Sequence, residues 1–143
     1  TGHEAESVCG AAGDALDDPR VTVVHNPRAG DGMSSSLRAG LAAAAPADAV
    51  MIFLADMPRV DAPLARAVVH RYASSAARVA APLADGRTGH PVILRSDLFP
   101  AIERLDVDAG ARRVIDENRG RTALLQDVDP ATQQDVDVPA DLQ

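Results

Sequence analysis

Apolar residues occur along the chain in short runs separated by amphipathic segments. Five runs rich in Val, Ile, Leu and Ala predict strands: residues 20–26, 48–56, 78–83, 92–95 and 122–128. Four intervening segments have the composition or the i, i+4 spacing of helices: residues 32–45, 64–75, 96–105 and 109–120. This alternation predicts an α/β fold, a Rossmann-like, open and mostly parallel sheet with helices on both faces.

Length and composition predict a single domain over residues 1–143. Apolar residues make up 46% of the chain and aromatic residues only 2%, so the core must consist of Ala, Val, Leu and Ile. Pro and Asp interrupt every apolar run well short of the roughly 18 residues that a membrane span needs, so we expect no membrane partner. The single cysteine, Cys9, offers no internal disulfide and favours a cytoplasmic protein.

Charge narrows the classes of partner. The formal net charge is −7, which argues against a nucleic-acid partner because such proteins usually present a basic face. All 14 basic residues are Arg, so any mechanism that requires a lysine is excluded within this chain. A small anionic substrate could still bind through a metal ion.

The stretch "FLADMP" places Asp56 at the end of the most apolar predicted strand. Ligands of open α/β sheets bind beyond the carboxyl ends of the strands, so Asp56 is a candidate metal ligand or phosphoacceptor. Alternatively it caps the following turn. A phosphoacceptor of the receiver-domain type would need a lysine and an acidic pair after an early strand. The chain has no lysine, and Asp17 and Asp18 precede the first predicted strand, so we reject this interpretation.

A partner carboxylate for a metal is available near the end of the chain. Residues 126–143 carry five Asp and no Arg, which is also the composition of a solvated acidic tail. Asp135 and Asp137 would share one face of an extended segment. Asp137 lies between two valines and is followed closely by Pro139, a pattern that favours a packed turn.

Two further stretches carry candidate binding groups. Gly30, Gly32 and the serines 34–36 lead into a predicted helix, whose first N–H groups suit a phosphate or the polar edge of a base. An ordinary N-cap formed by Ser34 or Ser35 is an equal alternative. The turn "TGHP" contains His90, and a lone loop histidine is more often a surface residue than a catalyst.

Taken in order, "VVHNPRAGDGMSSSLRAGL", "FLADMP", "GHPVIL" and "DVDVPADL" resemble the successive motifs of the MobA-like NTP transferases, the molybdenum cofactor nucleotidyltransferases. The "GHP" turn most resembles the cytidylyltransferase branch. This resemblance implies a domain of the nucleotide-diphospho-sugar transferase type that joins CTP to molybdopterin and releases pyrophosphate with Mg²⁺. It also implies delivery of the product to a molybdoenzyme of the xanthine dehydrogenase type.

The resemblance also implies roles for particular residues. Asp56 would be the catalytic metal ligand and would also contact the nucleotide, and Asp137 would be the second carboxylate near the same ion. The remaining nucleotide-binding residues would be Asn26, Gly32, Ser34, Ser35 and Ser36. The residues that face the pterin substrate would be Gly89, His90 and Pro91.

The sequence departs from the family pattern at two places. The family usually opens with a strand and a Gly-rich loop, L-A-A-G-x-S-x-R-M-G, followed by a lysine, and nothing like it occurs here. We therefore expect a domain that is incomplete at its N-terminus, lacks the central strand, and is weakly stable and inactive in isolation. In addition, Val138 stands where the family commonly has Thr.

Three alternatives to the cytidylyltransferase interpretation remain at this point. A guanylyltransferase that uses GTP, or another NTP transferase of the same fold, would share the motifs. A fragment that binds nucleotides or a partner protein without catalysis would share the fold, and it should tolerate loss of the Asp56 carboxylate.

Overall fold

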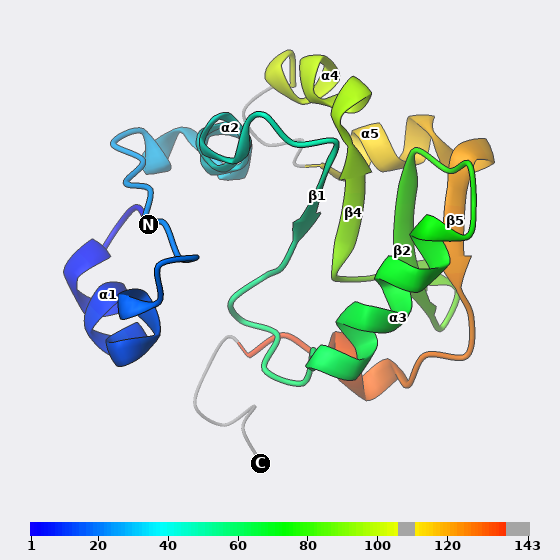
Figure 1. The fold of residues 1–143 in the computed structure, drawn as a ribbon, viewed down its shortest axis with the longest axis horizontal. Coiled ribbons are helices and arrows are strands. Elements are labelled where there is room, and N and C mark those ends of the chain that lie inside the picture. The colour runs from blue at the N-terminus through cyan, green and yellow to red at the C-terminus, as the bar shows by residue number, and fades with distance from the viewer. Residues whose placement is uncertain (106–110, 137–143) are drawn as a thin grey trace. The chain divides into compact units, whose positions relative to one another are not determined.

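The computed structural model describes residues 1–105 and 111–136. The chain divides into two compact units, and Figure 1 shows the ribbon of both. The first contains residues 1–47 and 99–114, and the second contains residues 48–98 and 115–143. No helix within the described ranges has the length and hydropathy that crossing a membrane requires.

The second unit contains an open sheet, and four of its five strands lie in or overlap predicted apolar runs, whereas β3 does not. The strands are β1 (Ala49–Ile52), β2 (Val79–Ala84), β3 (Arg87–Thr88), β4 (Val92–Arg95) and β5 (Thr122–Leu125). Their order is β1-β4-β2-β3, and β5 also pairs with β2. The structure therefore confirms an α/β fold with an open sheet.

The direction of pairing differs from the expected, mostly parallel sheet. β2 and β5 are parallel, whereas β4 is antiparallel to both of its neighbours, β1 and β2. β3 is also antiparallel to β2. The sheet is mixed because the chain returns directly from β2 through a tight turn, without a crossover helix, and a direct return can only produce an antiparallel neighbour.

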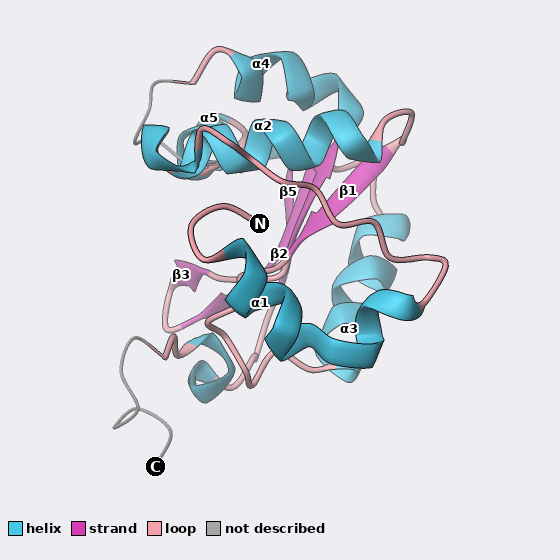
Figure 2. Cartoon of the chain, turned by 90° about the vertical axis from the view of Figure 1, so that its left-hand side faces the viewer, coloured by secondary structure: helices cyan, strands magenta, loops and turns pink. Residues whose placement is uncertain are grey.

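Helix α3 (Ala62–Ala73) covers one face of this sheet, as Figures 1 and 2 show. Val68 of α3 is fully buried against Ala80, Ile93 and Ala123 from three adjacent strands. The small alanine side chains let the helix approach the sheet closely, which a core with few aromatic residues allows. Residues of the opposite face are buried as well: Val79, Ala81, Val92 and Leu94.

The sequence explains why α3 starts where it does. The Asp61 side chain accepts a hydrogen bond from the Leu64 backbone N–H at 2.9 Å, and Pro63 occupies the first turn. Leu64 and Tyr72 lie on the same helix face as the buried Val68 and pack against the core. The predicted helix over residues 64–75 is thus confirmed, with its start two residues earlier.

The first unit is mainly helical. It contains α1 (Ala5–Ala12), α2 (Met33–Ala44) and α4 (Phe99–Glu103), with 3₁₀ turns at Gly13–Asp17 and Ala29–Asp31. α2 packs against α4, and the Arg38 guanidinium donates to the Leu105 carbonyl at 3.0 Å. Helix α5 (Arg112–Glu117) begins in this unit and ends in the second.

The strand predicted over residues 20–26 is wrong. This stretch has no regular secondary structure, and Val21 and Val23 are 43% and 47% exposed. Among the described residues, the backbone of this stretch forms long-range hydrogen bonds only with Thr1. The Thr1 amino group donates to the Val24 carbonyl, and the Thr1 carbonyl accepts from the Asn26 N–H. An apolar run becomes a strand only when a neighbouring strand supplies hydrogen-bond partners, and a single residue does not.

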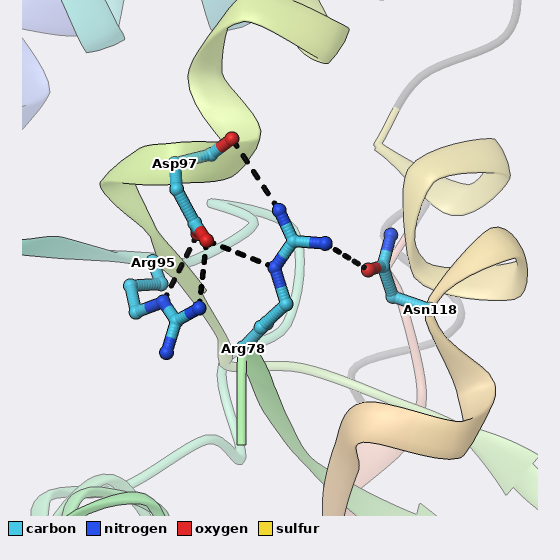
Figure 3. Close-up of polar contacts among 4 residues, drawn as sticks. All are labelled: Arg78, Arg95, Asp97 and Asn118. Atoms are coloured by element: carbon cyan, nitrogen blue, oxygen red, sulfur yellow. Dashed lines mark hydrogen bonds and ion pairs between the residues drawn. The ribbon is translucent and has the colours of Figure 1, made fainter. Parts of the chain in front are cut away.

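Three charged side chains join the ends of two strands in the second unit (Figure 3). Asp97 accepts hydrogen bonds from Arg95 at 2.6 and 3.0 Å and from Arg78 Nε at 3.0 Å. Arg78 also donates to the Asn118 side chain at 3.1 Å. The guanidinium of Arg95, helped by that of Arg78, lowers the pKa of the Asp97 carboxyl to about 2.

Replacing Asp97 by Asn is therefore expected to lower the free energy of unfolding by about 1 kcal/mol at neutral pH, since solvent screens these partly exposed ion pairs. The carboxyl pKa is lower in the folded than in the unfolded protein. Its stabilisation is thus complete above the ordinary value of 3.8 and is lost as the pH falls towards about 2. Urea unfolding of both proteins across this pH range measures the difference.

A suitable control is Asp116→Asn, which removes a surface pair with Arg119, three residues later in the sequence. We expect that change to cost less than Asp97→Asn, because among the described residues Asp116 has one arginine partner and Asp97 has two. A deficit in Asp97→Asn that stays constant down to pH 2 would contradict the electrostatic explanation.

Candidate functional site

Asp56 lies in a turn beyond the carboxyl end of β1. The predicted strand over residues 48–56 is too long, since β1 ends at Ile52 and Phe53 is 51% exposed. The reason is that Ile52 pairs with Val92, the first residue of β4, so the ladder has no partner for Phe53. Asp56 is exposed, and its carboxylate is thus accessible to a ligand.

His90 lies where the chain leaves the edge of β2. β2 and β3 form a hairpin whose two turn residues, Asp85 and Gly86, both have positive φ, as a type I′ turn requires. The pairs Leu83–Thr88 and Ala80–Ile93 lie three residues apart along β2. On the opposite side, along the segment from β3 to β4, they lie five residues apart. The two extra residues bulge out of the ladder, and His90 belongs to this bulge.

A cavity of about 470 Å³ adjoins this bulge. Gly89 and His90 line it together with Met57, Arg87, Thr88 and Gln133. Pro91, the third residue predicted to face the substrate, is buried and is not among the lining residues. The size is within the ordinary range for a small-molecule site.

Burial lowers the pKa of the His90 imidazole, and the Asp56 carboxylate opposes this shift. The imidazole is therefore mainly neutral at neutral pH, with one ring nitrogen able to donate and the other able to accept a hydrogen bond.

The segment after β5 contacts both of these loops. The Val136 N–H donates to the Asp56 carbonyl at 2.8 Å. Gln133, the last residue of the 3₁₀ turn η5 (Pro130–Gln133), makes two hydrogen bonds with the His90 backbone. Asp137 itself lies outside the described residues. Among the described residues, no three His, Cys, Asp or Glu side chains are grouped as a metal site.

Gln133 was missed by the sequence analysis. The preceding Asp129 and Pro130 are a typical start of a helical turn, and Asp129 does accept a hydrogen bond from the Ala131 N–H at 2.9 Å. This signal could have predicted an ordered turn. Its contact with His90, 43 residues earlier, depends on the tertiary fold and has no signal in the sequence.

The predicted nucleotide-binding residues of the first unit form a network of their own. The Asn26 amide donates to Ser35 Oγ at 2.9 Å and to Ser36 Oγ at 3.0 Å. Its carbonyl oxygen accepts from the Arg28 N–H, and the Ser35 hydroxyl lies 2.7 Å from the Arg28 carbonyl. Ser34 and Ser35 are buried, so these contacts fix the loop that precedes α2.

The N-cap of α2 is Gly32, with φ 90°, and not Ser34 or Ser35 as the capping alternative predicted. A positive φ at this position explains the glycine, because other residues adopt it at a cost. Asn26 and the exposed Ser36 also line a cavity of about 460 Å³ in this unit, together with Thr22, Val24, Ala39 and Gly40.

Comparison with known proteins agrees with this architecture. The profile of the MobA-like NTP transferase domain matches residues 4–123. Rv0371c from Mycobacterium tuberculosis H37Rv is 27% identical, with a TM-score of 0.76 over 99% of this chain and 70% of that chain. Its complex with manganese gives 26% identity and a TM-score of 0.72, over 99% of this chain and 72% of that chain.

An Rv0371c homologue from Mycobacterium sp. strain JC1 is 25% identical, with a TM-score of 0.64 over 78% of this chain and 55% of that chain. No curated protein sequence matches the chain. The profile match over most of the chain supports nucleotidyltransferase activity with a nucleoside triphosphate as substrate. From this match, the chain belongs to the MobA-like NTP transferase domain family.

Proposed function

We propose that the protein transfers a cytidylyl group from CTP to molybdopterin and releases pyrophosphate, with Mg²⁺ bound at Asp56 and Asp137. The observation that carries this proposal is the 2.8 Å hydrogen bond from the Val136 N–H to the Asp56 carbonyl. It joins two motifs that are 80 residues apart in sequence, "FLADMP" and "DVDVP". Asp137 follows directly after the residue that makes this bond.

The available donors suit the ion. Mg²⁺ in nucleotide enzymes usually takes one or two carboxylates, and phosphate and water oxygens complete its shell. Asp56 supplies an exposed carboxylate on a turn whose backbone is hydrogen-bonded to a second segment. The manganese complex of Rv0371c supports a divalent ion in a related protein. The bound ion would neutralise charge on the phosphates.

The protein itself has mainly to align the reactants. A phosphate oxygen of molybdopterin would attack the α-phosphorus of CTP, and the bond to pyrophosphate would break, so no side-chain nucleophile is needed. In this proposal Asn26, Gly32 and Ser36 lie along the nucleotide, and the buried Ser34 and Ser35 hold the loop that carries them. Gly89, His90 and Pro91 shape the pterin side. The 470 Å³ cavity beside His90 supports the second assignment for Gly89 and His90.

The choice of CTP over GTP depends on the resemblance of the "GHP" turn to the cytidylyltransferase branch. We further propose that residues 1–143 act as one family domain, that the protein works in the cytoplasm, and that the product passes to a molybdoenzyme of the xanthine dehydrogenase type.

Asp56→Asn is expected to reduce turnover of CTP with molybdopterin by about 100-fold or more, because the neutral amide removes the charge that holds the ion. The measurement is pyrophosphate release by the whole protein that the gene encodes, with CTP and GTP compared. The matched control is Asp127→Asn. Asp127 is exposed, is not among the described residues that line the cavity beside His90, and has φ 58°, which Asn also adopts readily.

Full activity of Asp56→Asn would contradict the proposed metal site. Faster turnover of GTP than of CTP would assign the protein to the guanylyltransferase branch. Mg²⁺-dependent CTP binding without any pyrophosphate release would instead indicate a module that binds nucleotides without catalysis.

Asp137→Asn is expected to raise the Mg²⁺ concentration needed for half-maximal activity by about 10-fold, since one of two carboxylate ligands is lost. Asp135→Asn is the control for the general loss of negative charge in the same segment. A metal titration of both variants separates the two effects. An equal shift in both would show that Asp137 acts only through the overall charge of the segment.

A further inference from the structure

The bulge at His90 leaves backbone groups without ladder partners. The Gly89 N–H donates to the Pro82 carbonyl at 2.9 Å, which continues the pairing with β2 by one residue. The two extra residues then separate His90 from β2, and regular pairing resumes only at β4. Because His90 is partly buried, its N–H and carbonyl need other partners.

The Gln133 carboxamide supplies both partners. Its oxygen accepts from the His90 N–H at 2.6 Å, and its nitrogen donates to the His90 carbonyl at 2.9 Å. The side-chain nitrogen also contacts Thr132 Oγ1 at 3.0 Å, which fixes the plane of the amide. One planar amide thus pairs with both backbone groups of a single residue, as a neighbouring strand would.

This pairing explains the glycine before His90. A Cβ atom at position 89 would overlap Gln133 Oε1, and it would lie 2.5 Å from Cδ and 3.0 Å from Cγ of the same side chain. Its three nearest neighbours all belong to Gln133. Gly89 does not have a positive φ, so the requirement for glycine comes from the path of the glutamine side chain and not from the backbone.

Gln133 is itself held by a segment that reaches the proposed metal side. Asp129 caps the 3₁₀ turn that carries Gln133. Three residues after Gln133, the Val136 N–H donates to the Asp56 carbonyl. The same short segment therefore contacts the bulge and the Asp56 turn. A displacement of Gln133 would move the wall of the 470 Å³ cavity without removing any group proposed to bind the ion.

We propose that Gln133 is a positioning residue, which clamps the His90 backbone and so fixes the acceptor side of the site, and that Gly89 is required to leave room for this clamp. The identity of the acceptor molecule rests on the proposed function. The clamp itself rests on the two hydrogen bonds and on the space at Gly89.

The kinetic test compares Gln133→Ala, Gly89→Ala and the double variant in the whole protein. We expect each single change to raise the KM for molybdopterin by about 10-fold while the KM for CTP stays within about twofold, because only the acceptor wall moves. The double variant should be no worse than Gln133→Ala, since the added methyl group clashes with the side chain that Gln133→Ala removes. Gln134→Ala, at the exposed neighbour, is the control.

Gln133→Glu provides a finer comparison. The carboxylate can still accept from the His90 N–H, but it cannot donate to the His90 carbonyl. We therefore expect a KM for molybdopterin between those of the unmodified protein and Gln133→Ala. A merely structural role would instead lower stability and change all kinetic parameters together.

Amide hydrogen exchange at His90, followed by NMR, tests the clamp without any turnover. Gln133→Ala and Gly89→Ala should each accelerate exchange of this amide by about 10-fold or more, since its hydrogen bond is lost. Unchanged exchange in Gln133→Ala, or additive effects in the double variant, would overturn the clamp.

The two proposals fail in different ways. If the unmodified protein shows no transfer from CTP to molybdopterin, the proposed function is wrong, and the exchange data alone decide whether Gln133 holds His90. If the protein is active and exchange accelerates but the KM for molybdopterin does not change, the clamp exists and its positioning role is wrong.

Discussion

One edge of β2 must pair with two successive strands, and this constraint sets the position of the candidate site in the second unit. The hairpin through Asp85 and Gly86 pairs β2 with β3. β4 then pairs with the same edge of β2, with the register shifted by two residues. The excess chain has to leave the sheet, and it does so at Gly89–Pro91. Because β1 in turn pairs with β4, the end of β1 is fixed by the same bulge, and the chain turns towards Asp56 just beyond it.

A bulge that interrupts a ladder leaves backbone groups that need other hydrogen-bond partners. Here a segment distant in sequence supplies these partners. Gln133 pairs with His90, and the Val136 N–H binds the Asp56 carbonyl, so the segment after β5 holds both loops. This arrangement suits a transferase. Reactant alignment is the main task of such an enzyme, and hydrogen bonds from a second segment help to hold the loops that line its site.

The core that supports these loops is built from small and branched aliphatic side chains. Val68 of α3 lies over Ala80, Ile93 and Ala123, and the alanines allow the helix to lie close to the sheet. At the other end of the same strands, Asp97 joins Arg78 and Arg95. Val68 at the centre of the α3 contacts is fully removed from solvent, whereas the charged cluster is partly exposed, so the hydrophobic contacts contribute more to stability.

The sequence by itself determined most of the strands of the second unit, its helix α3 and the family to which the chain belongs. The apolar runs located β2, β4 and β5, Asp61 and Pro63 explain the start of α3, and the ordered motifs indicated the family. These features are local, because a run of apolar residues or a capping side chain acts within a few positions of the chain. The position of Asp56 beyond β1 followed from the same reasoning, although the length of that strand did not.

Only the tertiary structure decided which backbone groups find partners. Residues 20–26 have strand composition without strand structure, β1 stops at Ile52, and Gly32 instead of a serine caps α2. The pairing of Gln133 with His90 is of the same kind, and it gives Gly89 a reason that no turn propensity predicts. Hydrogen bonds between segments 40 or 80 residues apart depend on where the whole chain folds, and a one-dimensional pattern of polar and apolar residues does not contain that information.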